Sequence, residues 1–294
     1  MTGFDTYCVS TPAEEHLKRR FYKQKNYALE SRSRIWRKGL GMRKNRIRVK
    51  WESGKPVICG WLSSNSAYTA ELAGHAGFDC VNIDLQHGMT GFESAQLMLH
   101  ALSATPATPI VRVPSVEATL MMKVLDAGSY GIICPMVEDK ETAKTFVAAT
   151  RYPPLGNRSF GPARGLLYGG PDYFKDADET IVRLAMIETA EGLEQIDAVS
   201  SVQGLDGVFI GPNDLALSLG YDPSPDPTEP PVVEAIKDIL QSAKSHGRHA
   251  GIFCPSGVVA QRRIEEGFDF VVPNSDVNLL KKTMKEEIAA IGEW

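Results

Sequence analysis

The sequence lacks any long apolar run, and its five cysteines form neither a CxxC nor a CxxH pair. No stretch approaches the roughly 18 apolar residues that a membrane span needs, and the N-terminus has no apolar core typical of a secretory signal. The cysteines are odd in number and scattered, and Cys80 and Cys134 lie inside apolar runs, so free thiols are favoured over a disulfide framework. These absences predict a cytoplasmic protein with no membrane partner.

Charge is unevenly distributed along the 294 residues, although the net charge is only −4. Residues 1–50 hold 14 of the 32 Lys and Arg but only 4 of the 36 Asp and Glu, a local charge of +10 against −14 for the remainder. A basic segment can bind nucleic acid or a membrane surface. Residues 1–41 show no aromatic or glycine repeat, however, and the acidic remainder would repel polyanions. Binding of this kind is a remote alternative, and we expect no nucleic-acid partner.

Short apolar runs alternate with helix-like stretches from about residue 56 onward. Each run has four to seven residues, as expected of parallel strands that are buried on both faces. The runs cover residues 56–62, 80–84, 109–113, 131–134, 184–188, 207–210, 249–253 and 268–272. The first run is not followed by the GxGxxG turn of a doubly wound dinucleotide fold. Eight strand–helix repeats over roughly 240 residues therefore predict an α/β protein with a (β/α)8 TIM barrel.

Active sites of such barrels lie at the C-terminal ends of the strands, which makes polar residues there the candidates. Glu188 and Asp214 carry the hard oxygen ligands that Mg²⁺ and Mn²⁺ prefer, although Asp214 has about even odds of being only a helix cap. The run containing Arg112 is otherwise apolar, so this residue is either a structural ion-pair partner or a binder of a carboxylate or enolate oxygen. His87 suits proton transfer at neutral pH. The remaining candidates are Asp84, Asn213 and a polar wall at residues 273–275.

Asp126 ends a predicted helix, where the helix dipole disfavours an anion, so it needs a compensating partner such as a histidine. A helix that precedes the fourth strand ends at the face opposite His87. We therefore expect Asp126 to reach that histidine only across a subunit contact or through an irregular turn.

An ordered set of short motifs closely resembles the 4-hydroxy-2-oxoheptanedioate aldolase family, the metal-dependent (class II) pyruvate aldolases. The motifs lie at residues 80–88 (CVNIDLQHG), 110–114 (IVRVP), 123–128 (KVLDAG), 151–154 (RYPP), 186–189 (MIET) and 206–215 (DGVFIGPNDL). The resemblance spans about residues 42–285. It implies a barrel of the phosphoenolpyruvate/pyruvate-domain type and a homohexamer in which the last helix swaps to a neighbouring subunit.

The resemblance also implies a role for each matched residue. Glu188 and Asp214 match the ligands of a divalent metal (Mg²⁺, Mn²⁺ or Co²⁺), and Arg112 matches the residue that binds the pyruvate keto oxygen. His87 matches the catalytic base, with Asp126 as its partner in a dyad. The loop Gly211, Pro212, Asn213 and Asp214 would bind the pyruvate carboxylate, and residues 158–161 resemble a loop that shapes the aldehyde end.

One motif departs from the family pattern. Many members read Asp-Gly-Glu-His where this chain has Asp84, Leu85, Gln86 and His87. The neutral Gln86 removes a negative charge near the water shell of the metal, while Asp84 and the base are retained. The catalytic chemistry should therefore persist, but neither the metal preference nor the natural aldehyde is carried over from the family.

These features predict retro-aldol cleavage of a 4-hydroxy-2-oxo acid to pyruvate and an aldehyde, with oxaloacetate decarboxylation as a related activity. No predicted strand ends in the lysine that a Schiff-base route would need. The rival is an acyl-CoA lyase related to the citrate lyase β subunit. Residues from Met42 resemble the usual start of the family, so residues 1–41 are interpreted as a basic N-terminal extension and residues 42–294 as the aldolase domain. A chain that begins at Met42 should fold and be active.

Overall fold

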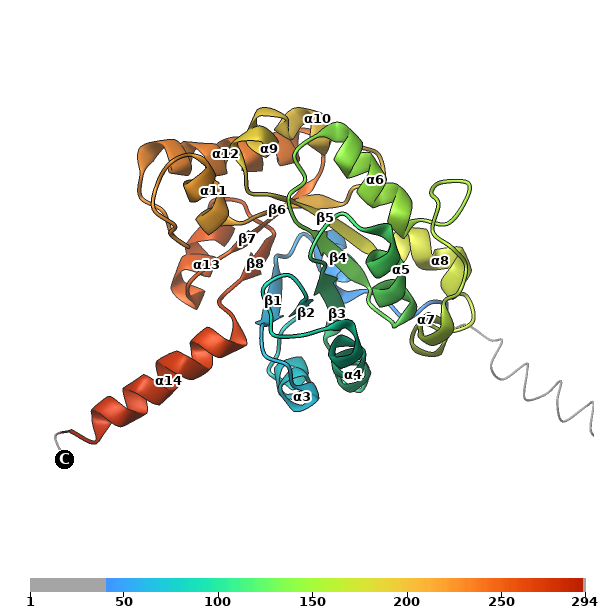
Figure 1. Ribbon diagram of the computed structural model, residues 1–294, viewed down its shortest axis with the longest axis horizontal. Coiled ribbons are helices and arrows are strands. Elements are labelled where there is room, and N and C mark those ends of the chain that lie inside the picture. The colour runs from blue at the N-terminus through green and yellow to red at the C-terminus, as the bar shows by residue number, and fades with distance from the viewer. Residues whose placement is uncertain (1–40, 293–294) are drawn as a thin grey trace, which may run out of the picture. The chain divides into compact units, whose positions relative to one another are not determined.

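Eight parallel strands close into a barrel in the order β1 to β8 in the computed structural model, which describes residues 41–292 (Figure 1). The strands are β1 (Val57–Leu62), β2 (Cys80–Asp84), β3 (Thr108–Arg112), β4 (Gly131–Cys134), β5 (Val182–Ile187), β6 (Gly207–Ile210), β7 (His249–Phe253) and β8 (Phe270–Val272). The predicted (β/α)8 barrel is confirmed. The proposed extension at residues 1–41 lies outside the described residues, apart from Gly41.

The described part of the chain has thirteen helices, most of which surround the barrel in a ring (Figure 1). They are α2 (Arg46–Glu52), α3 (Ala67–His75), α4 (Phe92–Ser103), α5 (Ala118–Asp126), α6 (Lys140–Thr150), α7 (Ala163–Gly169), α8 (Tyr173–Thr180), α9 (Ala190–Glu194), α10 (Ile196–Ser200), α11 (Pro212–Ser218), α12 (Pro230–Ser245), α13 (Gly257–Glu265) and α14 (Asp276–Ala290). No helix among the described residues is long and apolar enough to cross a membrane.

The strands are mostly apolar because successive side chains pack into two different cores. One set points into the barrel, where Cys59, Leu184 and Phe209 belong to an inner cluster. The alternate set points outward and packs against the helices, as Val81 and Val208 do. The described cysteines, Cys59, Cys80, Cys134 and Cys254, are free and buried. This alternation directs the last inward-facing residue of each strand to the barrel mouth.

The N-terminal end of the barrel is closed by α2. Ile47 of this helix is fully buried in the inner cluster. Trp51 stacks on His249 with 3.7 Å between ring centroids, and its indole N–H donates to the carbonyl oxygen of Asp269 at 3.0 Å. Both contacts lie where β7 and β8 begin. Helix α2 therefore acts as a plug at the end of the barrel opposite the mouth.

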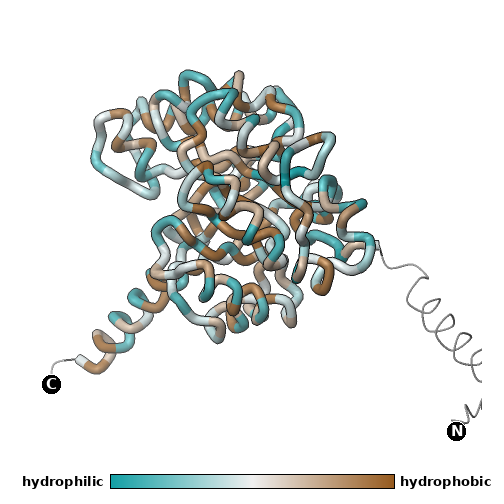
Figure 2. The backbone as a smooth tube through the Cα atoms, turned by 45° about the vertical axis from the view of Figure 1, so that its right-hand side comes forward, coloured by the Kyte–Doolittle hydropathy of each residue, from teal (hydrophilic) through white to brown (hydrophobic). Residues whose placement is uncertain are grey.

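Helix α14 projects away from the barrel, and none of its residues is buried (Figure 1). Figure 2 shows hydrophobic positions recurring along it. Val277, Leu280, Met284 and Ile288 are exposed apolar residues with helical spacing, and Leu279 and the capping residue Ile291 are also exposed. This apolar stripe has no partner within the part of the chain that the structure describes.

Candidate active site

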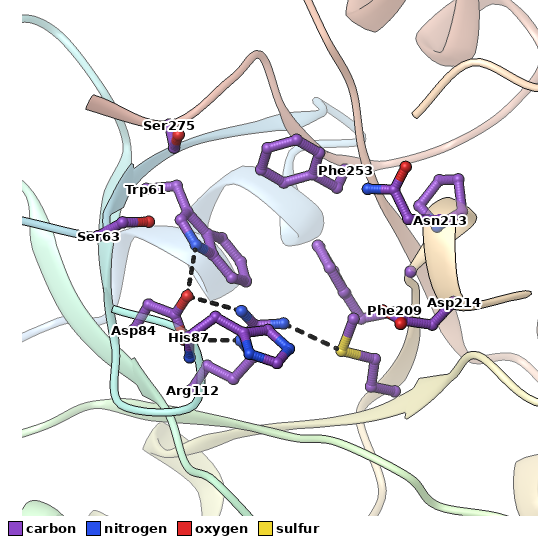
Figure 3. A pocket seen from close by; sticks show the side chains of 13 residues that line it. Trp61, Ser63, Asp84, His87, Arg112, Phe209, Asn213, Asp214, Phe253 and Ser275 are labelled. Carbon is purple, nitrogen blue, oxygen red and sulfur yellow. Dashed lines mark hydrogen bonds and ion pairs between the residues drawn. The ribbon is translucent and has the colours of Figure 1, made fainter. Parts of the chain in front are cut away.

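A cavity of about 180 Å³ opens at the C-terminal ends of the strands, where the sequence predicts the site. The candidates that line it are Asp84, His87, Arg112, Gly211, Pro212, Asn213 and Asp214, and Ser275 adds the expected polar wall. Figure 3 shows Asp84, His87 and Arg112 on one side of the cavity, with Asn213 and Asp214 on the other. The sequence therefore predicted most of the polar lining correctly.

Asp84, the last residue of β2, fixes the guanidinium of Arg112, the last residue of β3. Nε of Arg112 donates to Oδ1 of Asp84 at 2.9 Å, and Nη2 donates to Oδ2 at 2.6 Å. The two residues are register partners on adjacent strands, which places the two side chains side by side. The third nitrogen, Nη1, takes no part in this two-point pairing. It contacts Sδ of Met186 at 3.9 Å. Arg112 is therefore held by an ion pair and still presents a donor to the cavity.

The Asp84 carboxylate stays ionised within the barrel. Burial raises its pKa, but hydrogen bonds from Arg112 and the backbone bring the pKa below its ordinary value. The indole N–H of Trp61 donates to Oδ2 at 3.3 Å, and the guanidinium of Arg112 lies 4.7 Å from the centroid of the Trp61 ring. A charge-assisted pair of this kind keeps the guanidinium in one orientation.

The turn that carries His87 is also organised by Asp84. Its Oδ1 accepts the backbone N–H groups of Gln86 at 3.0 Å and of His87 at 3.2 Å. Gly88 closes the turn, since a Cβ there would lie 2.2 Å from the carbonyl oxygen of Asp84. His87 is exposed and lines the cavity, whereas the partly buried Gln86 does not. One carboxylate thus sets the positions of both the arginine and the histidine.

Asp214 of α11 lines the cavity, whereas Glu188, which directly follows β5, is not among its lining residues. Glu188 is 2% exposed, and its Oε1 accepts the backbone N–H of Met136 at 3.0 Å. Burial raises the pKa of Glu188, and the nearby charge of Asp214 raises it further. Asp214 lies in the first turn of α11 and is exposed. A cation bound between these two carboxylates would offset the cost of burying the charge of Glu188 and the repulsion between Glu188 and Asp214.

Glu188 and Asp214 fit a metal ion that prefers six oxygen ligands and takes few of them from the protein. Among the described residues, no group of three or more His, Cys, Asp and Glu could hold a metal. Mg²⁺ is commonly bound through one or two carboxylates, with waters and substrate completing its shell. A Cβ at Gly211 would lie 2.7 Å from Oε2 of Glu188, so the absence of a side chain at Gly211 leaves space beside this oxygen.

Asp126 and Arg158 lie elsewhere in the chain, and neither lines the cavity. Nη2 of Arg158 donates to Oδ1 of Asp126 at 2.7 Å and to the hydroxyl of Tyr173 at 3.0 Å. Burial raises the pKa of Asp126, and the hydrogen bond from Arg158 opposes this shift. Within one chain, the compensating partner of Asp126 is therefore an arginine, and the expected pairing with His87 is absent from the described residues.

The apolar walls of the cavity are the part that the motifs did not predict. Trp61, Phe209 and Phe253 line it together with Met186. The indole of Trp61 stacks on Phe209 with 5.7 Å between centroids, and its edge meets Phe253 at 5.8 Å. The sequence did contain a signal for these aromatic residues, because they occupy inward-facing positions of β1, β6 and β7.

Comparison with known proteins places the chain in a family. Residues 58–281 match the family model described as HpcH/HpaI aldolase/citrate lyase. A hydroxypyruvate/pyruvate aldolase from Rhizorhabdus wittichii is 44% identical over 83% of this chain and 98% of its own length. A 5-keto-4-deoxy-D-glucarate aldolase from Escherichia coli is 35% identical, covering 82% and 94% respectively.

A solved structure agrees with the sequence comparisons. A HpcH/HpaI aldolase/citrate lyase family protein from Burkholderia cenocepacia superposes with a TM-score of 0.78 at 29% identity. The match covers 84% of this chain and 98% of that one. The resemblance drawn from the motifs is thereby confirmed, and the chain belongs to the HpcH/HpaI aldolase/citrate lyase family.

Proposed function

We propose that the chain is a class II pyruvate aldolase that reversibly cleaves a 4-hydroxy-2-oxo acid to pyruvate and an aldehyde. The observation that carries this proposal is the arrangement across the cavity, where Arg112 presents Nη1 and Asp214 lies opposite it (Figure 3). Family membership supports the same reaction class. The named relatives act on pyruvate-type substrates, which makes pyruvate or hydroxypyruvate the proposed ketoacid product.

Each group has a proposed role in binding or proton transfer. Arg112, clamped by Asp84, orients the 2-oxo group of the substrate through Nη1. The substrate carboxylate lies at the loop from Gly211 to Asp214, where the first N–H groups of α11 lack helical acceptors. His87 removes the proton of the 4-hydroxyl, directly or through a water, and the C3–C4 bond breaks. The aldehyde leaves, and the enolate gains a proton at C3 to give pyruvate.

Glu188 and Asp214 are proposed to hold a divalent cation, with Mg²⁺, Mn²⁺ and Co²⁺ as candidates. The bound cation would supply Lewis-acid polarisation of the 2-oxo group. Because oxaloacetate decarboxylation produces the same enolate, we propose it as a side activity. The carboxamide of Gln86 leaves the cation with less negative surroundings than a glutamate would.

We further propose a homo-oligomer, with a hexamer as the expected state. The exposed apolar stripe on α14 supports docking of this helix on a neighbouring subunit, because such stripes mark interfaces. Assembly would also allow Asp126 of one subunit to approach His87 of another. The four free buried cysteines support the expected cytoplasmic location.

Chelation tests the metal route. We expect excess EDTA to abolish pyruvate release from a 4-hydroxy-2-oxo acid, and Mg²⁺, Mn²⁺ or Co²⁺ to restore it. Activity that persists in EDTA, or borohydride trapping of pyruvate on a lysine, would overturn the proposal. A malyl-CoA cleavage assay tests the acyl-CoA lyase alternative, for which cleavage of malyl-CoA without aldol activity is the deciding result.

A further inference from the structure

Asp276, the first residue of α14, binds the loop that follows β1. Its Oδ1 accepts the backbone N–H of Ser63 at 2.8 Å, and its Oδ2 accepts the N–H of Ser64 at 3.3 Å. The hydroxyl of Ser64 also donates to Oδ2. The two loop residues are more than 200 positions from Asp276 in the sequence, so this carboxylate joins the last helix to the first strand of the barrel.

The same two serines hold the turn that carries His87. The carbonyl oxygen of Ser63 accepts the backbone N–H of Met89 at 3.0 Å. The carbonyl oxygen of Ser64 accepts the hydroxyl of Thr90 at 3.4 Å. Since Met89 and Thr90 come directly after the His87–Gly88 turn, a continuous set of hydrogen bonds runs from Asp276 through the serines to the histidine-bearing loop.

Two further contacts tie this region to the cavity. Ser63 and Ser275 both line it, and Ser275 forms a bridge with Trp61. Trp61 in turn donates to Asp84, the residue that clamps Arg112. The loop after β1 and the start of α14 therefore contact the site in two ways. They hold the His87 turn, and through Trp61 they contact Asp84, which orients Arg112.

We propose that Asp276 is a positioning residue for the aldolase reaction, fixing the His87 turn and the Trp61 wall without touching substrate. The inference rests on the proposed role of His87. A simple helix cap would bind N–H groups of its own helix, as Asp139 does for α6 by accepting from Thr142 at 2.7 Å. Apart from the adjacent N–H of Val277, every donor to Asp276 comes from the β1 loop.

A graded set of variants tests the proposal. Ser64→Ala removes one donor, Asp276→Asn replaces an acceptor oxygen with an NH₂ group, and Asp276→Ala removes the whole bridge. We expect kcat to fall in that order, with Asp276→Ala losing on the order of 100-fold, because small misplacements of a catalytic group have effects of this size. KM should change less than kcat. Asp139→Asn, which alters an exposed helix cap that does not line the cavity, is the matched control.

Hydrogen–deuterium exchange of the peptide covering residues 85–92 provides a readout independent of activity. We expect faster exchange in Asp276→Ala than in wild type and Asp139→Asn, with helix content and oligomeric state unchanged. Unchanged exchange at this peptide would overturn the inference. So would a kcat in Asp276→Ala equal to that of wild type. A wild-type protein without aldolase activity would count against the proposed function, while the exchange comparison would still decide whether Asp276 holds the turn.

Discussion

Glu188 is a buried carboxylate with space beside one of its oxygens, because Gly211 has no side chain. Its Oε1 is occupied by the backbone N–H of Met136, so the other oxygen, Oε2, is the one available to a ligand. Gly211 lies beside that oxygen with a φ of −97°, which any residue can adopt. The glycine is therefore required for space and not for backbone freedom.

Gly211→Ala should weaken metal binding while leaving the fold intact. The added Cβ would lie 2.5 Å from Cε of Met186 and 2.7 Å from Oε2 of Glu188, so one of these groups must move. Titration calorimetry with Mn²⁺ should show at least tenfold weaker binding, since about 1.4 kcal/mol corresponds to a factor of ten. Gly257→Ala, where a Cβ meets nothing within 4 Å, serves as control. Equal Mn²⁺ affinity in both variants would contradict this role for Gly211.

The residue types, together with their positions at the ends of predicted strands, were enough to predict that four side chains lie together at the barrel mouth. These are Arg112, His87, Asn213 and Asp214. Sequence reasoning left Arg112 as either an ion-pair partner or a ligand-binding group, and the structure shows an ion pair with Asp84 in which Nη1 takes no part. Its pairing with Asp84 could not be read from spacing. It depends on the register between β2 and β3, which is fixed by tertiary packing.

At the scale of elements, α2 and the starts of β7 and β8 are joined at the barrel base by Asp269. Its Oδ2 lies 2.7 Å from Nδ1 of His249 and 2.7 Å from Nζ of Lys244. Burial raises the pKa of Asp269, but the hydrogen bonds from His249 and Lys244 bring it below its ordinary value. The carboxylate therefore stabilises the fold above its unfolded pKa near 4, and this contribution is lost as pH falls through its lower folded pKa.

Asp269→Asn should make stability less sensitive to acid. At pH 7 we expect the variant to be less stable by about 1–3 kcal/mol, because a partly buried charged acceptor of several hydrogen bonds is removed. Between about pH 5 and pH 3, the free energy of unfolding should fall more steeply in wild type than in the variant. Urea unfolding at several pH values measures both slopes. Parallel curves would show that Asp269 does not contribute in this way.

Element boundaries were predictable where the pattern is long and periodic. Apolar residues recur with helical spacing at residues 92–102 and 232–244, which predicts helices there, and these correspond to α4 (Phe92–Ser103) and α12 (Pro230–Ser245). Short helices such as α9 and α10 have five residues each, too few to show a period. The fifth strand begins two residues before its predicted start, because Val182 and Arg183 pair with Gly131 and Ile132 of β4. Such pairing depends on the neighbouring strand, so the start of β5 could not be predicted from its own residues.

At the scale of the whole molecule, the proposed proton-transfer pair is divided between two regions. His87 lines the cavity at the barrel mouth, whereas Asp126 ends α5, which leads into the opposite end of β4. Within one chain Asp126 pairs with Arg158, so the proposed pair with His87 would have to form between subunits. The sequence predicted that Asp126 lies at the face opposite His87, but its partner within the chain, Arg158, could not be predicted because their contact depends on tertiary packing.

Mixing inactive variants tests this division. His87→Ala and Asp126→Ala should each have little activity alone. If the pair forms between subunits, co-refolded mixtures should regain about a quarter of wild-type activity, because random assembly in a symmetric oligomer places two intact partners together at that frequency. Separately refolded samples combined afterwards are the control. Absence of recovery in mixed oligomers of normal size would argue against a shared site.

The projecting helix α14 affects how newly synthesised chains associate before they assemble. A helix of 15 residues is about 22 Å long, and its apolar stripe is fully available before a partner arrives. Until then, productive association competes with non-specific aggregation, and both depend on the concentration of unassembled chains. Rapid overproduction should therefore lower the soluble yield, and slower synthesis or chaperones that cover apolar surfaces should raise it.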